Sequence, residues 1–350
     1  FFSHSMASQL SWDEWRCVAN FVQSAALSHV CHTTWQALQR RHLSWYAGPS
    51  SVTRMTALLQ GDPAVQTLSL TCKDLPDEGV CDLARLKDAP RLSKLTLVLE
   101  GSLLGDRGGT LAGARGAAAL ANLQFAPSLT DLTLMLPNHQ LGDAGTRELA
   151  ALKAAPALTT LTLGLEGNHI SDAGAHALAA LHDAPALTAL ALDLPHNSIR
   201  DAGCRALARL GCAPALARLR LSLGGNRIGN AGAQALAMLR DSPSLTALSL
   251  DLEGYQIGDS GARALATLKG TPALTALSLG LGGNQIGDRG ARALAAFQDM
   301  PLLANLTLGL MGNQITDSGA RALTSLKEAP VLHTLALDLG GNEVEDTGAR

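Results

Sequence analysis

One short pattern returns along most of this chain at a constant distance, and it constrains the fold more than any other feature. The pattern is Asp-x-Gly or a close variant, and from residue 145 to residue 348 its glycine returns every 29 residues. A fixed period of this size indicates stacked repeats, because one small unit cannot bury its apolar face alone. The recurring glycines are Gly79, Gly108, Gly145, Gly174, Gly203, Gly232, Gly261, Gly290, Gly319 and Gly348.

Aligned on this glycine, the units share the pattern P-x-L-T-x-L-x-L-x-L-x-G-N-x-I-x-D-x-G-A-x-A-L-A-x-L-x-x-A. This pattern resembles the leucine-rich repeat and is most similar to the long, helix-containing, ribonuclease-inhibitor-like type. The resemblance covers about residues 62–350. It implies an α/β fold, a right-handed solenoid of about ten repeats with parallel strands on the concave face and helices on the convex face.

The first half of each unit has the alternation of a strand with one buried face. In the unit that begins at Pro185, Leu190, Leu192 and Leu194 alternate with smaller or polar residues. Asn197 follows where the chain turns away from the strand, and its amide can bond to backbone groups that the turn leaves unpaired. Its counterparts are Asn168, Asn226, Asn284, Asn313 and Asn342.

The second half of the unit predicts a helix that returns the chain to the next parallel strand. Asp201 is expected to be the N-cap of this helix, and Gly203 to permit close packing. Leu207 and Leu210 are three residues apart and predict its buried face, and Pro214 ends it. Because the aspartates share one structural slot, they are interpreted as caps and not as catalytic acids. They are Asp143, Asp172, Asp201, Asp259, Asp288, Asp317 and Asp346.

Some units depart from the pattern. Later units have two more residues before the Asn slot than the first one, which predicts a longer strand or a bulge. The glycine-rich insertion Gly108–Gly116 predicts a bulging loop on the helix side. His139 fills the Asn slot of one unit, with Asn138 in place of the turn glycine. Tyr255 fills the Asn slot of another, where it should swing outward or distort the turn.

The first fifty residues differ in composition and predict a separate helical cap, residues 1–50, before the solenoid of residues 51–350. Apolar residues at helical spacing indicate two or three short helices that cover the edge of the first repeat. Most aromatic residues of the chain lie in this segment: Phe1, Phe2, Trp12, Trp15, Phe21, Trp35, Trp45 and Tyr46.

Residues 10–38 also resemble a degenerate F-box. Leu10 and Val18 occupy two of its apolar positions, and the pair Val30–Cys31, followed by Trp35, resembles its ending. Ser11 stands where that motif has proline, and the spacing from Cys31 to Trp35 is one residue too long. The resemblance implies a Skp-type adaptor as partner, with Trp12, Trp15 and Trp35 as candidate contact residues. A purely structural cap is the alternative.

Composition excludes several classes of function. A formal net charge of −3 does not suit a nucleic-acid partner, and no apolar run is long enough for membrane insertion. Without a secretory signal, and with six cysteines in no paired spacing, we expect an intracellular, cytoplasmic protein with free thiols. No recurrent His or Cys arrangement indicates a metal, a cofactor or an enzyme. The chain ends within a repeat, at Arg350, so we expect it to be a fragment.

The surface predicted to carry function is the outward side of the strands, where small polar residues predominate. Its most distinctive patch consists of Arg218 and Arg220 with Asp193 on one side and Asp251 and Glu253 on the other. This patch predicts either a cross-strand charge ladder or a polar docking site for a partner loop.

The sequence therefore favours a non-catalytic protein–protein interaction module. One specific hypothesis is a substrate receptor of a cullin-type ubiquitin ligase, in which the first segment binds the adaptor and the repeats hold the substrate. The other is a structural or scaffolding subunit, in which the solenoid is a rigid spacer in a larger assembly.

Overall fold

The computed structural model describes residues 42–60, 62–101, 112–254 and 256–345. In this part of the chain a single sheet of 11 strands runs from one end to the other, and every strand pairs in parallel with the next one in sequence. The strands are β1 His42–Ala47, β2 Thr67–Lys73, β3 Lys94–Glu100, β4 Asp131–Met135, β5 Thr160–Gly164, β6 Ala189–Asp193, β7 Arg218–Ser222, β8 Ala247–Asp251, β9 Ala276–Gly280, β10 Asn305–Gly309 and β11 Thr334–Asp338.

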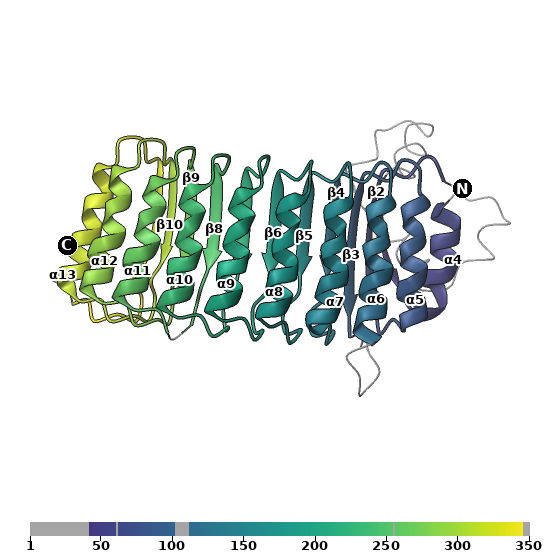
Figure 1. Cartoon of the computed structure of the whole chain (residues 1–350), viewed down its shortest axis with the longest axis horizontal. Coiled ribbons are helices and arrows are strands. Elements are labelled where there is room, and N and C mark those ends of the chain that lie inside the picture. The colour runs from purple at the N-terminus through teal and green to yellow at the C-terminus, as the bar shows by residue number, and fades with distance from the viewer. Residues whose placement is uncertain (1–41, 61, 102–111, 255, 346–350) are drawn as a thin grey trace, which may run out of the picture.

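An α-helix stands between consecutive strands throughout the described chain (Figure 1). The helices are α4 Pro49–Gln60, α5 Asp77–Leu83, α6 Ala112–Ala121, α7 Gly142–Leu149, α8 Asp172–Ala179, α9 Asp201–Leu207, α10 Asn230–Leu236, α11 Asp259–Leu265, α12 Asp288–Leu294 and α13 Asp317–Leu323.

From α5 onward each α-helix continues into a short 3-10 helix, which tightens the last turn before the proline that ends it. The 3-10 helices are η2 Ala84–Asp88, η3 Asn122–Phe125, η4 Ala150–Ala154, η5 Ala180–Asp183, η6 Ala208–Cys212, η7 Ala237–Asp241, η8 Ala266–Gly270, η9 Ala295–Asp299 and η10 Thr324–Glu328.

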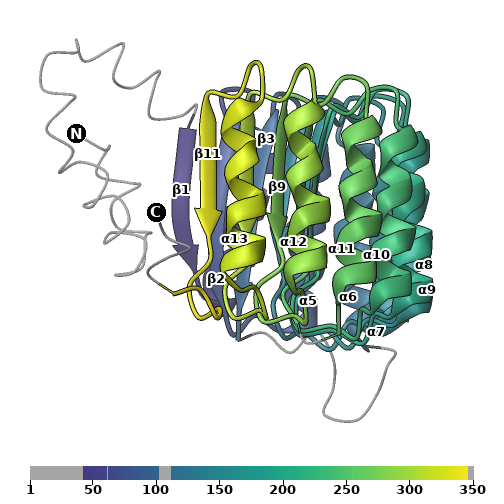
Figure 2. The ribbon, with the colours of Figure 1, turned by 90° about the vertical axis from the view of Figure 1, so that its left-hand side faces the viewer.

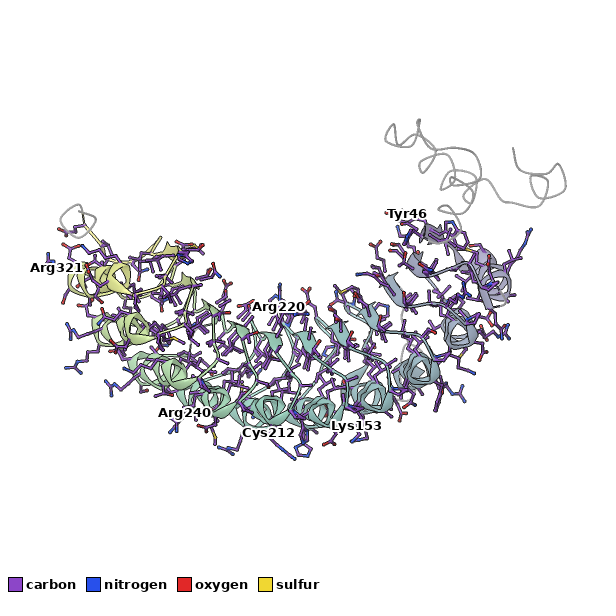
Figure 3. All side chains as sticks on the ribbon, turned by 90° about the horizontal axis from the view of Figure 1, so that it is seen from above. Tyr46, Lys153, Cys212, Arg220, Arg240 and Arg321 are labelled. Atoms are coloured by element: carbon purple, nitrogen blue, oxygen red, sulfur yellow. The ribbon has the colours of Figure 1, made fainter. Side chains whose placement is uncertain are left out.

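The array bends into an arc with the strands on its concave side and the helices on its convex side (Figure 3). Seen along the solenoid, the sheet and the helices form two layers (Figure 2). The core lies between them and is built from leucines in register, such as Leu190, Leu219 and Leu248. Leu207 and Leu210 are fully buried, as predicted. The predicted α/β solenoid, with parallel strands on the concave side and helices on the convex side, is confirmed.

The Asn slot forms a ladder of hydrogen bonds between neighbouring repeats. Asn197 Oδ1 accepts from the backbone N–H groups of Asn168 at 3.0 Å and Ile170 at 2.9 Å. Its Nδ2 donates to the carbonyl oxygens of Leu165 and Leu194, both at 3.0 Å. With a longer bond from Nδ2 to the carbonyl oxygen of Pro195 at 3.2 Å, the side chain binds five backbone groups in two repeats, which confirms the predicted role of this slot.

The Asp slot forms a second ladder, and here the prediction of a cap for the residue's own helix is wrong. The N-cap of α9 is Arg200, and Asp201 is already helical. Asp201 Oδ1 instead accepts from the N–H groups of Gly229 at 2.9 Å and Gly232 at 2.8 Å, at the start of α10. Because the helices pack side by side, the carboxylate of one helix lies next to the unpaired N–H groups of the following one.

Gly203 shows why this motif needs glycine. A Cβ there would lie 2.7 Å from Asp172 Oδ1 and 2.7 Å from Ile199 Cγ2, both closer than real Cβ contacts. The predicted close packing is therefore a close approach of the Gly203 backbone to the Asp172 carboxylate. We call the aspartates of the Asp slot, with the N–H groups that they bind, the carboxylate ladder.

The longer strands predicted for the later units are wrong. Strands β2 and β3 have seven residues, whereas β4 to β11 have five. The two additional residues of the later units form a turn, whose αL position is filled by glycine, or by Asn138 and His196, which have φ of 60° and 54°. The expected substitution of Asn138 for the turn glycine is thus confirmed.

At the N-terminal side, the solenoid begins earlier than the predicted boundary at residue 50. His42–Ala47 pairs with β2 as strand β1, and Pro49–Gln60 is a helix, so this part of the predicted cap belongs to the array. The predicted cap helices within residues 1–41 lie outside the described residues. Of the predicted loop Gly108–Gly116, residues 108–111 also lie outside them, while residues 112–116 are helical and belong to α6.

Candidate functional site

The centre of the concave face is an open hollow with a floor of small side chains. The outward positions of β5 to β10 line a volume of about 380 Å³. Because inward positions carry leucine, the strand pleat leaves only the alternate residues for this surface. The outward side chains are Thr160, Thr162, Ala189, Ala191, Arg218, Arg220, Ala247, Ser249, Ala276, Ser278, Asn305 and Thr307.

Two arginines rise from this floor. Arg218 and Arg220 occupy the first and third positions of β7, and both are exposed. Their neighbours in register are Ala189 and Ala247 for Arg218, and Ala191 and Ser249 for Arg220. Since these neighbours are short, both guanidinium groups are accessible above the floor, and Figure 3 shows Arg220 pointing into the hollow.

Carboxylates lie at the strand ends beside the arginines. Asp193 and Asp251 are both opposite Ser222 in the sheet, which separates them by one strand. Asp251 Oδ2 accepts a hydrogen bond from Ser222 Oγ at 2.8 Å. Asp193 Oδ1 is 3.4 Å from Arg220 Nε, a distance that makes an ion pair, yet this buried oxygen has no hydrogen bond within the described chain.

The predicted cross-strand charge ladder is therefore present only at Asp193 and Arg220. Arg218 forms no ion pair with any residue that the structure describes. Asp251 is engaged by Ser222, a residue that sequence reasoning did not select, although its position in register between the two aspartates could have indicated it. The patch is incompletely neutralised, and this favours the docking-site interpretation over the self-satisfied ladder.

The remaining predicted residues have different locations. Glu253 is exposed in the turn after β8, where its backbone N–H donates to Asp251 Oδ1 at 3.2 Å. Tyr255 lies outside the described residues, as do Trp12, Trp15 and Trp35. The neighbouring Gly254 is not in the αL conformation that Gly225 and Gly283 adopt in the equivalent turns. The backbone of this turn therefore differs from its neighbours at Gly254, while the predicted outward swing of Tyr255 itself lies outside the described residues.

The ionisable groups with shifted pKa lie away from the concave floor. Burial raises the pKa of the Cys72 thiol to about 11, and burial with repulsion from Asp201 raises that of Cys204 to about 12. Neither cysteine forms a disulfide within the described chain, and the same holds for the exposed Cys81 and Cys212. High pKa values make the two buried thiols poor nucleophiles.

His139 fills the Asn slot between two repeats and is fully buried. Its Nδ1 lies 2.7 Å from the carbonyl oxygen of Pro137, and its Nε2 has no hydrogen-bond partner among the described residues. Burial lowers the pKa of this imidazole, although the bond to the carbonyl works in the other direction. Its isolation inside the array gives it a structural position rather than contact with a ligand.

The described residues contain no group of three His, Cys, Asp or Glu side chains placed to hold a metal ion. None of their helices combines the length and the apolar character that crossing a membrane requires.

Comparison with known proteins gives one family. A model described as "Leucine Rich repeat" matches seven segments, residues 157–179, 190–208, 219–237, 242–266, 277–295, 304–323 and 333–350. A search of curated proteins found no match. Among solved structures, an internalin (inlF) from Listeria monocytogenes is 18% identical, with 96% of this chain and 91% of that chain covered and a TM-score of 0.45. A TLR13–ssRNA13 complex is 19% identical, with 82% of this chain and 37% of that chain covered and a TM-score of 0.41.

Proposed function

Since residues 157–350 carry leucine-rich repeats, we propose that this chain is a non-catalytic protein–protein interaction module whose concave face holds the partner. The observation that carries the proposal is the pair Arg218 and Arg220, exposed above a floor of small side chains and only partly neutralised. Repeats of this kind stack into extended concave surfaces that suit protein partners.

The chemistry of the patch favours a polypeptide loop. Arginine offers a planar set of donors that can bind a carboxylate or a carbonyl oxygen in a bidentate manner. The short side chains of Ala189, Ala191 and Ala247 let the main chain of a partner approach the sheet closely. The exposed part of the Asp193 carboxylate, at the end of β6, and Glu253, in the turn after β8, add acceptors for a donor of the same loop. A partner loop that presents a carboxylate beside a basic or amide group fits this arrangement.

Site-specific photocrosslinking tests the location of the partner. The chain with a photoreactive amino acid at Ser249, on the concave floor, is incubated with extract from the native source, and the chain with the same amino acid at Thr324, an exposed residue of η10 on the helix side, serves as the control. We expect a crosslinked protein at Ser249 that is lost when Arg218→Ala and Arg220→Ala are combined. A partner captured equally at both positions, or unaffected by the double substitution, contradicts the proposal.

A more specific version of this function rests on the first segment. The F-box-like spacing of residues 10–38 supports a substrate receptor of a cullin-type ubiquitin ligase, with a Skp-type adaptor on Trp12, Trp15 and Trp35 and an intracellular location. The test is binding of purified Skp-type adaptor to the full chain, compared with a Val30→Asp, Trp35→Asp variant. Absence of binding by the unaltered chain rejects the receptor and leaves the concave interaction site standing.

The alternative is a structural subunit in which the solenoid acts as a rigid spacer. The regular hydrogen-bond ladders between repeats support this alternative, because they hold the arc in one shape. Gel filtration of native extract distinguishes the two functions. A spacer elutes in a large assembly that persists in high salt and with the Arg218 and Arg220 substitutions. A receptor exchanges its partner, so its complex is lost under these conditions.

A further inference from the structure

The convex face carries a row of arginines that the concave site does not explain. They occupy one slot, two residues after the Asp-x-Gly glycine, on α7, α9, α11, α12 and α13, and all are exposed. None forms an ion pair within the described chain, and Arg292 Nη2 donates only to Ser318 Oγ, at 3.4 Å. We call Arg147, Arg205, Arg263, Arg292 and Arg321 the arginine row.

A second row of cations on the same face, the lysines of the 3-10 helices, differs because its members form ion pairs. In the 3-10 helices, Lys153 Nζ lies 3.0 Å from Asp183 Oδ2, and Lys269 Nζ lies 2.9 Å from Asp299 Oδ2, each bond bridging two neighbouring repeats. Lys327 Nζ is 3.8 Å from Glu328 Oε1. The same convex face thus has one row of cations neutralised by carboxylates and one that is not. Figure 3 shows Lys153 and Arg321 on this outer side.

The arginine row is interrupted at α8, where His176 takes the slot, and at α10, where Gln234 does, and a hollow of about 490 Å³ opens at α10. Its floor includes Ala231, Ala235 and Ala264, and Met238 stands in it with 58% of its surface exposed. Exposed methionine beside small residues provides an adaptable apolar contact.

The repeat register surrounds this hollow with positive charge. Arg205 and Arg263 occupy the slot of Gln234 on the helices before and after α10, and both are exposed. Arg209 occupies the slot of Met238 in the preceding repeat and is also exposed. Of these three, none has an ion pair among the described residues. Arg240 lines the hollow as well, 3.4 Å from Asp241.

We propose that this hollow is a second docking site and that its occupant is an acidic, amphipathic segment of a partner protein. An apolar side chain of the segment packs on Met238 and the neighbouring alanines, and its carboxylates bind Arg205, Arg209 and Arg263. Methionine and arginine are both enriched in protein interfaces, and desolvated arginines act as anchors there. Charge complementarity selects an acidic segment, because none of these three cations forms a salt bridge within the described chain, and the carboxylate of Asp183 that attracts Arg209 is itself paired with Lys153.

Other anionic partners fit less well. A nucleic acid or an anionic membrane requires a broad excess of positive charge, and this chain has a net charge of −3 with a carboxylate in most repeats. The hollow has no aromatic side chain among its lining residues on which a base could stack. Its alanines and its single methionine form a compact apolar contact surrounded by arginines, a pattern that matches one face of an amphipathic helix.

Fluorescence anisotropy with the whole chain tests this site. The probe is a labelled peptide of about 15 residues, long enough to form a helix, with leucine on one face and glutamate on the others. We expect Arg205→Gln, Arg209→Gln and Arg263→Gln together to weaken binding about tenfold. The control combines Lys153→Gln, Lys269→Gln and Lys327→Gln, which changes the net charge equally, and should weaken binding about twofold or less. Equal losses in the two triple variants overturn the proposal.

Three further measurements complete the test. Met238→Ser should weaken peptide binding a few-fold, and a peptide of the same composition with scrambled order should bind more weakly. Binding of a single-stranded DNA oligonucleotide or of phosphatidylserine vesicles in preference to the peptide overturns the proposal. The Arg218→Ala, Arg220→Ala variant should bind the peptide as the unaltered chain does. This result separates the convex site from the concave site of the proposed function, so that either can fail alone.

Discussion

Two regions of this solenoid are rich in polar side chains, and they differ in how far those side chains are satisfied. Between the repeats, Asn197 and Asp201 belong to slots that recur, and their side chains bind backbone groups of the neighbouring unit. On the concave face, Arg218 and Arg220 belong to one repeat, and only Arg220 lies near a carboxylate. In an array of copies, recurrence therefore marks structure, and departure from it marks candidate function.

The largest effect should come from the interior ladder. Replacing Asn197 with alanine leaves the N–H groups of Asn168 and Ile170 buried without acceptors, which costs about 3 kcal/mol of unfolding free energy. Urea unfolding measures this loss. Arg218→Ala is the matched control from the concave face and should change stability by less than about 0.5 kcal/mol. Equal losses of unfolding free energy in the two variants would contradict the distinction between structural polar residues inside the array and functional ones on the concave face.

The next effect concerns the glycine beside the carboxylate ladder. Gly203→Ala places a Cβ 2.7 Å from Asp172 Oδ1, and the resulting strain should lower the free energy of unfolding by about 2 kcal/mol. Gly270→Ala, at the end of η8, is the control, because its Cβ meets no atom within 4 Å. A loss of stability in the control as large as that of Gly203→Ala would contradict the packing argument.

The carboxylate ladder itself should tolerate an amide. Asn230 occupies the Asp slot of its repeat and accepts from Gly258 and Gly261 at 2.9 and 2.8 Å, as Asp201 does in its own. Asp201→Asn should therefore cost less than about 0.5 kcal/mol, whereas Asp201→Ala loses the cap of α10 and costs about 1.5 kcal/mol. Thermal unfolding of both variants checks this order, and a reversal would exclude the capping role.

The smallest effect is a pH dependence of the unfolding free energy, caused by His139, which replaces asparagine in the Asn slot of one repeat. Burial lowers the pKa of His139 in the folded state below its unfolded value near 6.5, so protonation favours unfolding. Its contribution to stability is complete above pH 6.5 and is lost as the pH falls toward the lowered folded-state value.

The substitution His139→Asn restores the amide of the other repeats and should raise stability by about 1 kcal/mol while it flattens this slope. Urea unfolding at several pH values between about 5 and 7.5 is the measurement. A variant with the same slope as the unaltered chain would show that His139 is not the group responsible.

Much of the fold follows from the sequence, because each repeated position has one physical requirement. The leucines of β6 and the amide of Asn197 could be assigned before the structure, since alternation and turn position determine their roles. The target of Asp201 could not, because a carboxylate at a helix start suits its own helix and the next one equally well. Only the side-by-side packing of α9 and α10 selects between them.

The candidate site was predicted as a set of charges but not as an arrangement. The sequence places Asp193, Arg220 and Asp251 on successive strands, yet the register sets both aspartates opposite Ser222 rather than opposite an arginine. This register equals the 29-residue period, so the place of Ser222 between the two aspartates follows from the sequence, whereas its hydrogen bond to Asp251 and the ion pair of Asp193 with Arg220 do not. The convex hollow was missed for another reason, because Arg205, Gln234 and Arg263 attract attention only when the helices are seen side by side.

We expect the concave arginines to serve binding and not stability, and one double variant tests both parts of this expectation. Arg218→Ala and Arg220→Ala are combined in the full chain, and urea unfolding and photocrosslinking from Ser249 are measured on the same preparation. We expect an unfolding free energy within about 1 kcal/mol of that of the unaltered chain, together with loss of the crosslinked partner. A strongly destabilised chain, or a stable chain that retains its partner, would contradict it.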